Sequence, residues 1–190
     1  MKILIDGYNL IFECGLHGRH VNAESLARAR MRLLAEINAA FDENDRREIV
    51  IVYDAKKIPL SAQQEQDSSG GVTILYSINF DEADEMIEQL IARHSSPKKN
   101  LLVVSSDHRL QKAAMARRAA TIDSGDWFDQ VESRQSASHS NHGANQGADD
   151  VIETKSTGSS PLFTSEEIES LQRDVDQQVD RHGGRGDGRR

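Results

Sequence analysis

The sequence predicts an α/β fold, a three-layer α/β/α domain with a central, mainly parallel sheet, plus a flexible linker and a short C-terminal helix. Three observations support this prediction. Apolar runs of strand length alternate with stretches of helical period along the chain. The segments between strands are long enough for the right-handed crossovers that parallel strands require. Three apolar runs also stop at an acid, namely Asp6, Asp54 and Asp107.

The predicted elements begin with the first residues of the chain. Continuous apolar runs indicate the strands, and apolar residues three and four apart indicate the helices. Asn22 is a plausible cap for the first long helix. In order, the elements are a strand over 2–6, a loop through Gly15 and Gly18, a helix over 23–43, a strand over 48–54, a polar loop containing Gly70 and Gly71, a strand over 72–77, a helix over 81–94, a strand over 100–106, a helix over 108–118, a strand over 119–122, and a closing helix around Trp127, Phe128 and Val131.

The composition changes after residue 132. Residues 133–160 are rich in Ser, Asn, Gly, His and Gln and almost free of large apolar side chains. Such a segment cannot offset the entropy lost on ordering, so we expect a flexible linker. Residues 161–182 begin with a good helix-start signal and predict a short helix, and residues 183–190 predict a disordered tail. The folded domain is expected within residues 1–132.

Composition also limits the class of protein. Among 190 residues there is a single cysteine, Cys14, and no apolar run long enough to span a bilayer. With no leader signal at Met1, we expect a soluble cytoplasmic protein without a membrane partner; the sequence carries no signal for an oligomeric state. The formal net charge of −8 argues against a nucleic-acid partner, whose phosphates attract Lys and Arg. A divalent cation bound by the strand-end acids would weaken that objection.

The acids at the strand ends predict a metal site. In parallel sheets the functional crevice lies outside the carboxyl ends of the strands, where Asp6 and Asp107 are expected. Asp84 lies near the start of the 81–94 helix and can reach the same place, with Glu88 on the same helical face. Carboxylate oxygens suit Mg²⁺ or Mn²⁺, which can activate water for phosphodiester hydrolysis. Asp54 and Glu88 are peripheral candidates; Asp84 and Asp107 also fit a simpler role at helix starts.

Four segments, in this order, resemble the NYN domains of the PIN-like nuclease superfamily, and most of all the YacP-like branch of bacterial ribonucleases. They are residues 3–11, 52–55, 83–88 and 103–107, and the resemblance covers roughly residues 1–132. It implies a PIN-like fold and metal-dependent endonucleolytic cleavage of RNA, with the family acids at Asp6, Asp84 and Asp107. Asn9 matches an amide kept beside the first acid, and Ser106 a small polar residue beside the last.

The same resemblance bears on partners. YacP-like relatives include ribosome-associated enzymes that cut messenger RNA, which makes mRNA on the ribosome a candidate substrate here. The chain departs from the family pattern at Glu82, where a threonine or another small polar residue is common, and in its long C-terminal tail.

The resulting hypothesis is a metal-dependent endoribonuclease that hydrolyses single-stranded RNA. The three aspartates would bind one or two Mg²⁺ or Mn²⁺ ions. Asn9 would hydrogen-bond the phosphate or a water on the metal, and Ser106 would orient a carboxylate. Arg109 and Lys112 would guide RNA towards the metals. Tyr8 would stack a base, or alternatively pack against the loop that follows it.

Rival functions come from other classes. A catalytically silent adaptor would bind RNA or ribosomes without cleaving. A phosphatase of the haloacid-dehalogenase kind would need a second aspartate two residues after Asp6, where the chain has Tyr8. A receiver-type signalling domain would need an adjacent acidic pair and a late lysine, which the sequence does not offer.

Overall fold

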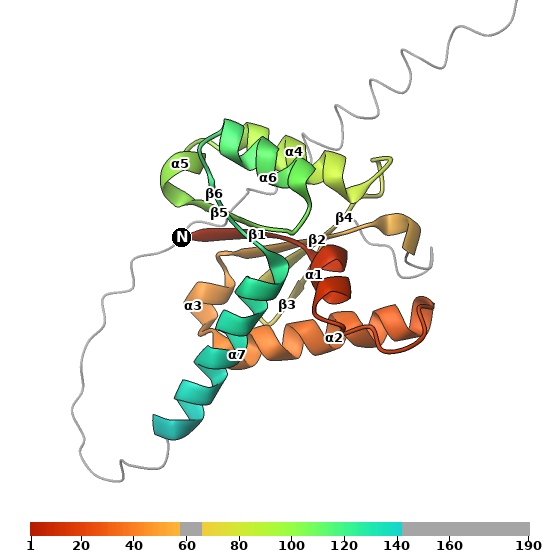
Figure 1. Ribbon diagram of the computed structural model, residues 1–190, viewed down its shortest axis with the longest axis vertical. Coiled ribbons are helices and arrows are strands. Elements are labelled where there is room, and N and C mark those ends of the chain that lie inside the picture. The colour runs from red at the N-terminus through yellow and green to blue at the C-terminus, as the bar shows by residue number, and fades with distance from the viewer. Residues whose placement is uncertain (58–65, 142–190) are drawn as a thin grey trace, which may run out of the picture.

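A six-stranded sheet forms the centre of the protein. The computed structural model describes residues 1–57 and 66–141, and the strand order in this part of the chain is β3-β4-β2-β1-β5-β6 (Figure 1). Five strands are parallel, and β3 pairs antiparallel with β4 at one edge. The strands are β1 (Lys2–Asp6), β2 (Ile49–Tyr53), β3 (Gln66–Ser69), β4 (Val72–Tyr76), β5 (Leu101–Val104) and β6 (Ala120–Ile122).

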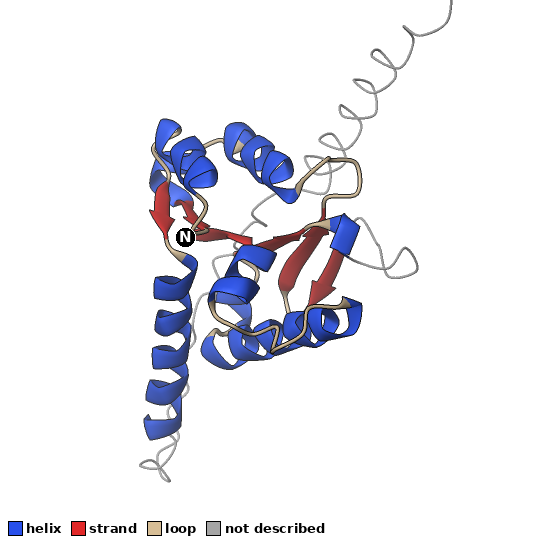
Figure 2. Ribbon diagram, turned by 45° about the vertical axis from the view of Figure 1, so that its right-hand side comes forward, coloured by secondary structure: helices blue, strands red, loops and turns tan. Residues whose placement is uncertain are grey.

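Helices cover both faces of the sheet (Figure 2). One layer contains α1, α2 and α7, and the opposite layer contains α4 and α6 (Figure 1). The predicted three-layer α/β/α class is therefore confirmed. The helices are α1 (Gly7–Glu13), α2 (Ala23–Ala40), α3 (Glu43–Arg46), α4 (Ala83–Arg93), α5 (Pro97–Asn100), α6 (His108–Ala116) and α7 (Ser124–Asn141), with one 3₁₀ turn, η1 (Ala55–Lys57).

The central strands are apolar because both of their faces are covered. In β2 every residue is buried. Ile49 and Ile51 pack in the core beneath α1, α2 and α7, whereas Val50 and Val52 pack in the core beneath α4 and α6. Successive side chains of a strand point to opposite faces, so a strand between two helical layers has no polar position.

The face of the sheet to which the following helix packs changes between β1 and β5. These strands are neighbours in the sheet, yet β1 leads into α1 in one layer and β5 leads into α6 in the other. The two connections diverge and leave a crevice at the carboxyl ends of the strands, the place where open α/β sheets bind ligands. The topology thus brings the ends of β1 and β5 together beside one opening.

Three local features differ from the sequence predictions. The chain forms helix α1 directly after β1 instead of a loop, and it forms the edge strand β3 within the predicted polar loop. Gly70 and Gly71, with φ of 60° and 96°, connect β3 to β4 in the left-handed conformation that tight hairpins require. The first long helix ends at Ala40, because Asp42 caps a separate turn, α3.

Helix α7 runs past residue 132 and reaches Asn141, so residues 133–141 are helical where the sequence predicted linker. The rest of the predicted linker, the predicted helix over 161–182 and the predicted tail over 183–190 lie outside the described residues. Within residues 1–57 and 66–141, no helix has the length and apolar character needed to cross a membrane.

Candidate active site

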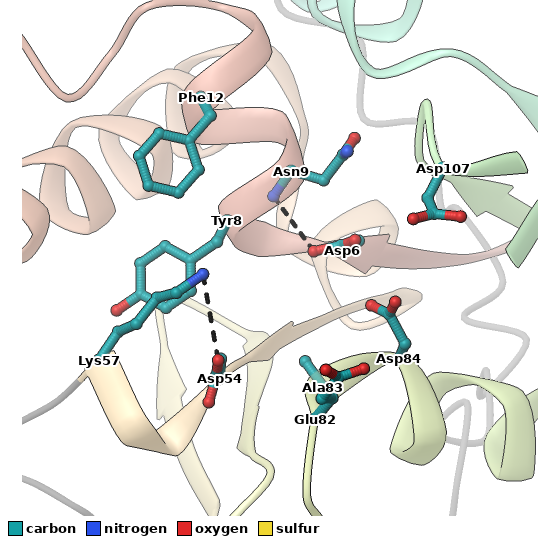
Figure 3. Close-up of a pocket in the computed structure, with 10 residues that line it drawn as sticks. All are labelled: Asp6, Tyr8, Asn9, Phe12, Asp54, Lys57, Glu82, Ala83, Asp84 and Asp107. Atoms are coloured by element: carbon teal, nitrogen blue, oxygen red, sulfur yellow. Dashed lines mark hydrogen bonds and ion pairs between the residues drawn. The ribbon is translucent and has the colours of Figure 1, made fainter. Parts of the chain in front are cut away.

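A pocket of about 330 Å³ opens at the carboxyl ends of β1 and β2, beside the start of α4 (Figure 3). The three aspartates singled out from the sequence all line it, and in Figure 3 their carboxylates face a common space. They come from three separate segments, the end of β1, the first turn of α4 and the start of α6. The lining residues are Asp6, Tyr8, Asn9, Phe12, Asp54, Lys57, Glu82, Ala83, Asp84 and Asp107.

Asp6 is the most buried of these acids, with 7% of its surface exposed. It ends β1 and caps α1, where its Oδ1 accepts a hydrogen bond of 3.1 Å from the Asn9 backbone N–H. The pKa of Asp6 is raised to about 6, mainly by burial; the charges of Asp84 and Asp107 add to the rise, and the hydrogen bonds from Asn9 and Ser105 oppose it. Near neutral pH the fold therefore holds an unfavourable negative charge at this position.

Gly7 allows the chain to turn sharply after Asp6. A Cβ atom at this position would lie 2.3 Å from Cε1 of Tyr53 and 2.7 Å from Cγ2 of Ile51, and both of these side chains are fully buried. Only glycine permits so close an approach of α1 to β2. The Asp6-Gly7 pair thus places the carboxylate at the strand end and starts a helix over the neighbouring strand.

Asp84 and Asp107 lie at the starts of the two helices in the other layer. Burial, and next the charge of Asp107, raise the pKa of Asp84 above its ordinary value. Asp107 caps α6, and its Oδ1 accepts a hydrogen bond of 2.6 Å from the Arg109 backbone N–H. Asp107 therefore does cap a helix, which is the simpler role that the sequence also suggested for it. The capping bond orients its side chain beside the pocket.

The hydroxyl group that contacts these acids belongs to Ser105, not to Ser106. The Ser105 hydroxyl donates to Asp6 Oδ2 at 3.4 Å and accepts from the Asp107 backbone N–H at 3.1 Å. The Ser106 hydroxyl instead accepts from the Ser124 backbone N–H at 3.1 Å. Strand alternation predicts this difference, because Val103 faces α4 and α6, and the side chain two residues later points the same way.

Asn9 holds two loops together beside the acids. Its Oδ1 accepts hydrogen bonds from the Ser106 backbone N–H at 2.9 Å and from the Ser124 hydroxyl at 2.7 Å. These bonds join α1 to the loop after β5 and to the start of α7. Ser124, fully buried and missed from the sequence, completes this connection. With the carbonyl oxygen engaged, the NH₂ group is the part of the Asn9 amide that remains to serve a ligand.

Glu88 and Arg109, both predicted to serve the site, bind each other. Arg109 donates from Nε and Nη2 to the two carboxylate oxygens of Glu88 at 2.8 and 2.9 Å, and its Nη1 lies 3.6 Å from Glu82. Neither Glu88 nor Arg109 lines the pocket. A bidentate ion pair of this kind fixes the orientation of the guanidinium, so Arg109 links α6 to α4.

The remaining predicted residues differ in their access to the pocket. Tyr8 lines it but is only 4% exposed; its hydroxyl accepts a hydrogen bond of 2.8 Å from Arg30, and its ring packs against Tyr53 of β2 instead of against a following loop. Asp54 lines the pocket and lies 4.0 Å from the ammonium of Lys57. Lys112 is exposed on α6 and does not line the pocket. Sequence reasoning missed Phe12 and Lys57, which carry no local motif.

The donor set fits a hard divalent cation. Its ligands would be carboxylate oxygens on an open face, as Mg²⁺ and Mn²⁺ prefer. The pKa values of Asp6 and Asp84 are raised mainly by burial and, to a lesser degree, by the charges of the neighbouring acids, which a cation would offset. In the described part of the chain, no three acidic, histidine or cysteine side chains are grouped closely enough to hold a metal ion. Water molecules would therefore have to fill part of the coordination shell.

Comparisons with known proteins bear on the family and the fold of the chain. The family model of the YacP-like NYN domain matches residues 3–173, which extends well beyond the part in which the sequence resemblance was seen. The crystal structure of Rae1 (YacP) from Bacillus subtilis has 21% sequence identity and a TM-score of 0.56, over 75% of this chain and 79% of that chain. A crystal structure of a single-residue mutant of the same Bacillus subtilis protein has 20% identity and a TM-score of 0.57, over 94% of this chain and 99% of that chain. A search of curated proteins finds no match.

Proposed function

This chain belongs to the YacP-like NYN domain family, within a superfamily of nucleases, and on that premise we propose that it is a metal-dependent endoribonuclease that hydrolyses phosphodiester bonds of single-stranded RNA. One observation carries the proposal. Three carboxylates from distant parts of the chain, Asp6, Asp84 and Asp107, line one open pocket at the point where the sheet topology reverses. Family membership supports the reaction class, and the pocket supports these residues as its site.

The proposed cofactor is Mg²⁺ or Mn²⁺, held by the three aspartates directly or through water. Such a cation, when bound, polarises the phosphodiester and activates water for attack. It would also offset the burial of negative charge and the smaller repulsion between the acids, which together raise the pKa values of Asp6 and Asp84. These acids must be ionised to bind the cation, so cation binding and protonation compete at the same oxygens.

The surrounding residues have supporting roles in this proposal. Ser105 orients Asp6 and the backbone of Asp107 at once, because its hydroxyl bonds both. Asn9 fixes the loop after β5 through its carbonyl oxygen and can offer its NH₂ group to a phosphate oxygen. The Arg109 guanidinium partly balances the acids of α4, since its charge opposes the rise in the Asp84 pKa that burial and Asp107 cause. Together they hold the carboxylates in place before substrate arrives.

The substrate class follows from the openness of the site and from the family. A single strand can enter an open pocket with its backbone exposed, whereas a paired A-form helix presents mainly its outer surface. Messenger RNA on the ribosome is the specific substrate that the YacP-like resemblance suggests. Co-sedimentation of the protein with ribosomes would test this part alone.

The proposal is tested by incubating purified protein with end-labelled single-stranded RNA in Mg²⁺, in Mn²⁺ or in a chelator. Internal cleavage is expected with metal and not with chelator. Asp84→Asn should reduce cleavage by more than about 100-fold, because it removes a ligand charge and not merely a supporting contact. Glu85→Gln is the matched control, since it neutralises the adjacent acid of the same helix, which does not line the pocket.

The outcomes separate the candidate functions. Cleavage that survives chelator, or equally strong cleavage by Asp84→Asn, would contradict the metal mechanism. RNA or ribosome binding without cleavage in any metal would instead support the catalytically silent adaptor. Circular dichroism of Asp84→Asn must match the wild type for the comparison to apply.

A further inference from the structure

The pocket has a second end that the proposed chemistry does not use. Figure 3 shows Phe12, Tyr8 and Lys57 on one side and Asp84 and Asp107 on the other, with Asp6 between them. Phe12 and Lys57 line the pocket but contact none of the three aspartates through any hydrogen bond or ion pair of the described chain. An aromatic ring and an ammonium beside a phosphodiesterase centre suggest a function in substrate binding.

Lys57 is the only basic side chain that lines this pocket among the described residues. Its Nζ lies 5.1 Å from the centroid of the Tyr8 ring, 5.5 Å from that of Phe12 and 4.0 Å from Asp54 Oδ2. The side chain is 44% exposed. Cation–π attraction and one loose ion pair therefore hold the ammonium at the pocket wall, where a stronger anionic partner can draw it away.

Phe12 offers the accessible aromatic surface. It lies near the end of α1 and is 36% exposed. His17 packs against it edge-on with ring centroids 5.1 Å apart, and Tyr8 lies 6.2 Å away, so the ring orientation is supported from two directions. Tyr8 cannot serve in the same way, because it is almost fully buried and packs against Tyr53 at 5.1 Å.

From this arrangement we propose a nucleotide subsite, in which Lys57 binds a backbone phosphate of single-stranded RNA and Phe12 stacks the base of the same nucleotide. The inference rests on the proposed function in taking RNA as the ligand. In the free protein the ammonium lies over the rings. A phosphate that draws Lys57 towards itself uncovers the face of Phe12, so the two contacts form together. Base stacking tolerates any base, which suits a subsite that positions the strand without reading its sequence.

The test measures RNA binding in chelator, so that it does not depend on cleavage. Fluorescence anisotropy compares a short labelled oligouridylate with the same ribose-phosphate chain lacking bases. The wild type should prefer the oligomer with bases, and Phe12→Leu should weaken its binding by roughly tenfold while leaving the base-free oligomer unaffected. Phe12→Tyr should restore the preference, because it keeps the ring. Met31→Ala, which removes an exposed apolar side chain outside the pocket, is the control.

Lys57 is tested through the salt dependence of the same binding. Lys57→Gln should reduce the slope of log K against log salt by about 0.7, the value for one phosphate contact on a single strand. Lys56→Gln should leave the slope unchanged, since Lys56 is exposed next in sequence but does not line the pocket. The preference for bases should survive in Lys57→Gln.

Three results would overturn the subsite. They are equal losses for both oligomers in Phe12→Leu, equal slopes for the two lysine variants, and no measurable RNA binding by the wild type. Failure of the proposed function is a separate result. A wild type that does not cleave in Mg²⁺ or Mn²⁺, but binds with the predicted dependence on Phe12 and Lys57, would contradict the nuclease and support the subsite.

Discussion

The strands of the sheet and the residues that directly follow them differ in what they bury. From Ile3 to Ile5 in β1, and throughout β2, the buried side chains are apolar and pack against helices on both faces. At the carboxyl ends of the strands the buried groups are polar, with Asp6 at the end of β1 and Ser105 after β5. Burial stabilises the first group through the hydrophobic effect, whereas it raises the energy of an ionised Asp6. The apolar packing of the strands therefore offsets the cost of burying an ionised group at the end of β1.

Stability and the proposed chemistry therefore depend on different positions of the same strands. A strand residue can be judged by how well it packs, whereas a strand-end residue has to be judged by its charge state and hydrogen bonds. Variants at the two kinds of position should consequently change stability and activity in different directions.

The largest effect is expected for Asp6→Asn. Asn caps helices as well as Asp and has nearly the same shape, so the local structure should persist. Loss of the carboxylate should reduce metal-dependent cleavage by more than about 100-fold. Stability should nevertheless increase at pH 8 in chelator, by up to about 3 kcal/mol, because the wild type must keep a buried group with a pKa of about 6 ionised.

The direction of this stability change depends on pH. The folded pKa of Asp6 lies above its ordinary value of 3.8, so protonation stabilises the fold. That contribution is complete below about pH 4 and is lost as the pH rises through about 6. The stability gap between Asp6→Asn and the wild type, from denaturant unfolding, should therefore be widest above pH 7 and close below pH 4. A gap independent of pH would mean that charge burial is not its cause.

A smaller effect is expected for Gly7→Ala, which changes packing and not charge. The added Cβ would meet the buried side chains of Tyr53 and Ile51, and overpacking of this kind costs about 1–3 kcal/mol. Thermal unfolding against Gly125→Ala provides the comparison, since a Cβ at Gly125 meets nothing within 4 Å. Equal midpoints for the two variants would show that α1 can shift away from β2 at little cost.

The sequence predicts the packed strands and helical layers better than the residues at the carboxyl ends of the strands, for physical reasons. Continuous apolar runs such as β2 require two covered faces, so the layers and the parallel strands follow from the pattern. The acids that end β1 and precede α6 could be assigned to one edge of the sheet from the same rule. Helix α1 was missed because it follows its strand with no connecting residue, and β3 because an edge strand built of Gln, Asp and Ser lacks an apolar run.

The supporting contacts were less predictable because they depend on which atoms meet. Both serines after β5 are small and polar, and only strand alternation distinguishes Ser105 from Ser106. The pairing of Glu88 with Arg109 joins α4 to α6, so no spacing within either helix reveals it. Phe12 reaches the pocket only because α1 exists. That these three acids line one pocket could thus be anticipated from the sequence, whereas their immediate surroundings required coordinates.

The smallest effect compares those two serines. Ser105→Ala and Ser106→Ala each remove one hydroxyl and leave one backbone N–H without its acceptor, so each should cost about 1 kcal/mol in stability. Only Ser105 also donates to Asp6, and this bond lowers the pKa of that acid. Ser105→Ala should therefore shift the rising limb of the pH–cleavage profile to higher pH at fixed Mg²⁺, while Ser106→Ala leaves it in place. Identical shifts in both variants would show that the Ser105 hydroxyl does not tune Asp6, and that only the backbone of the loop after β5 matters.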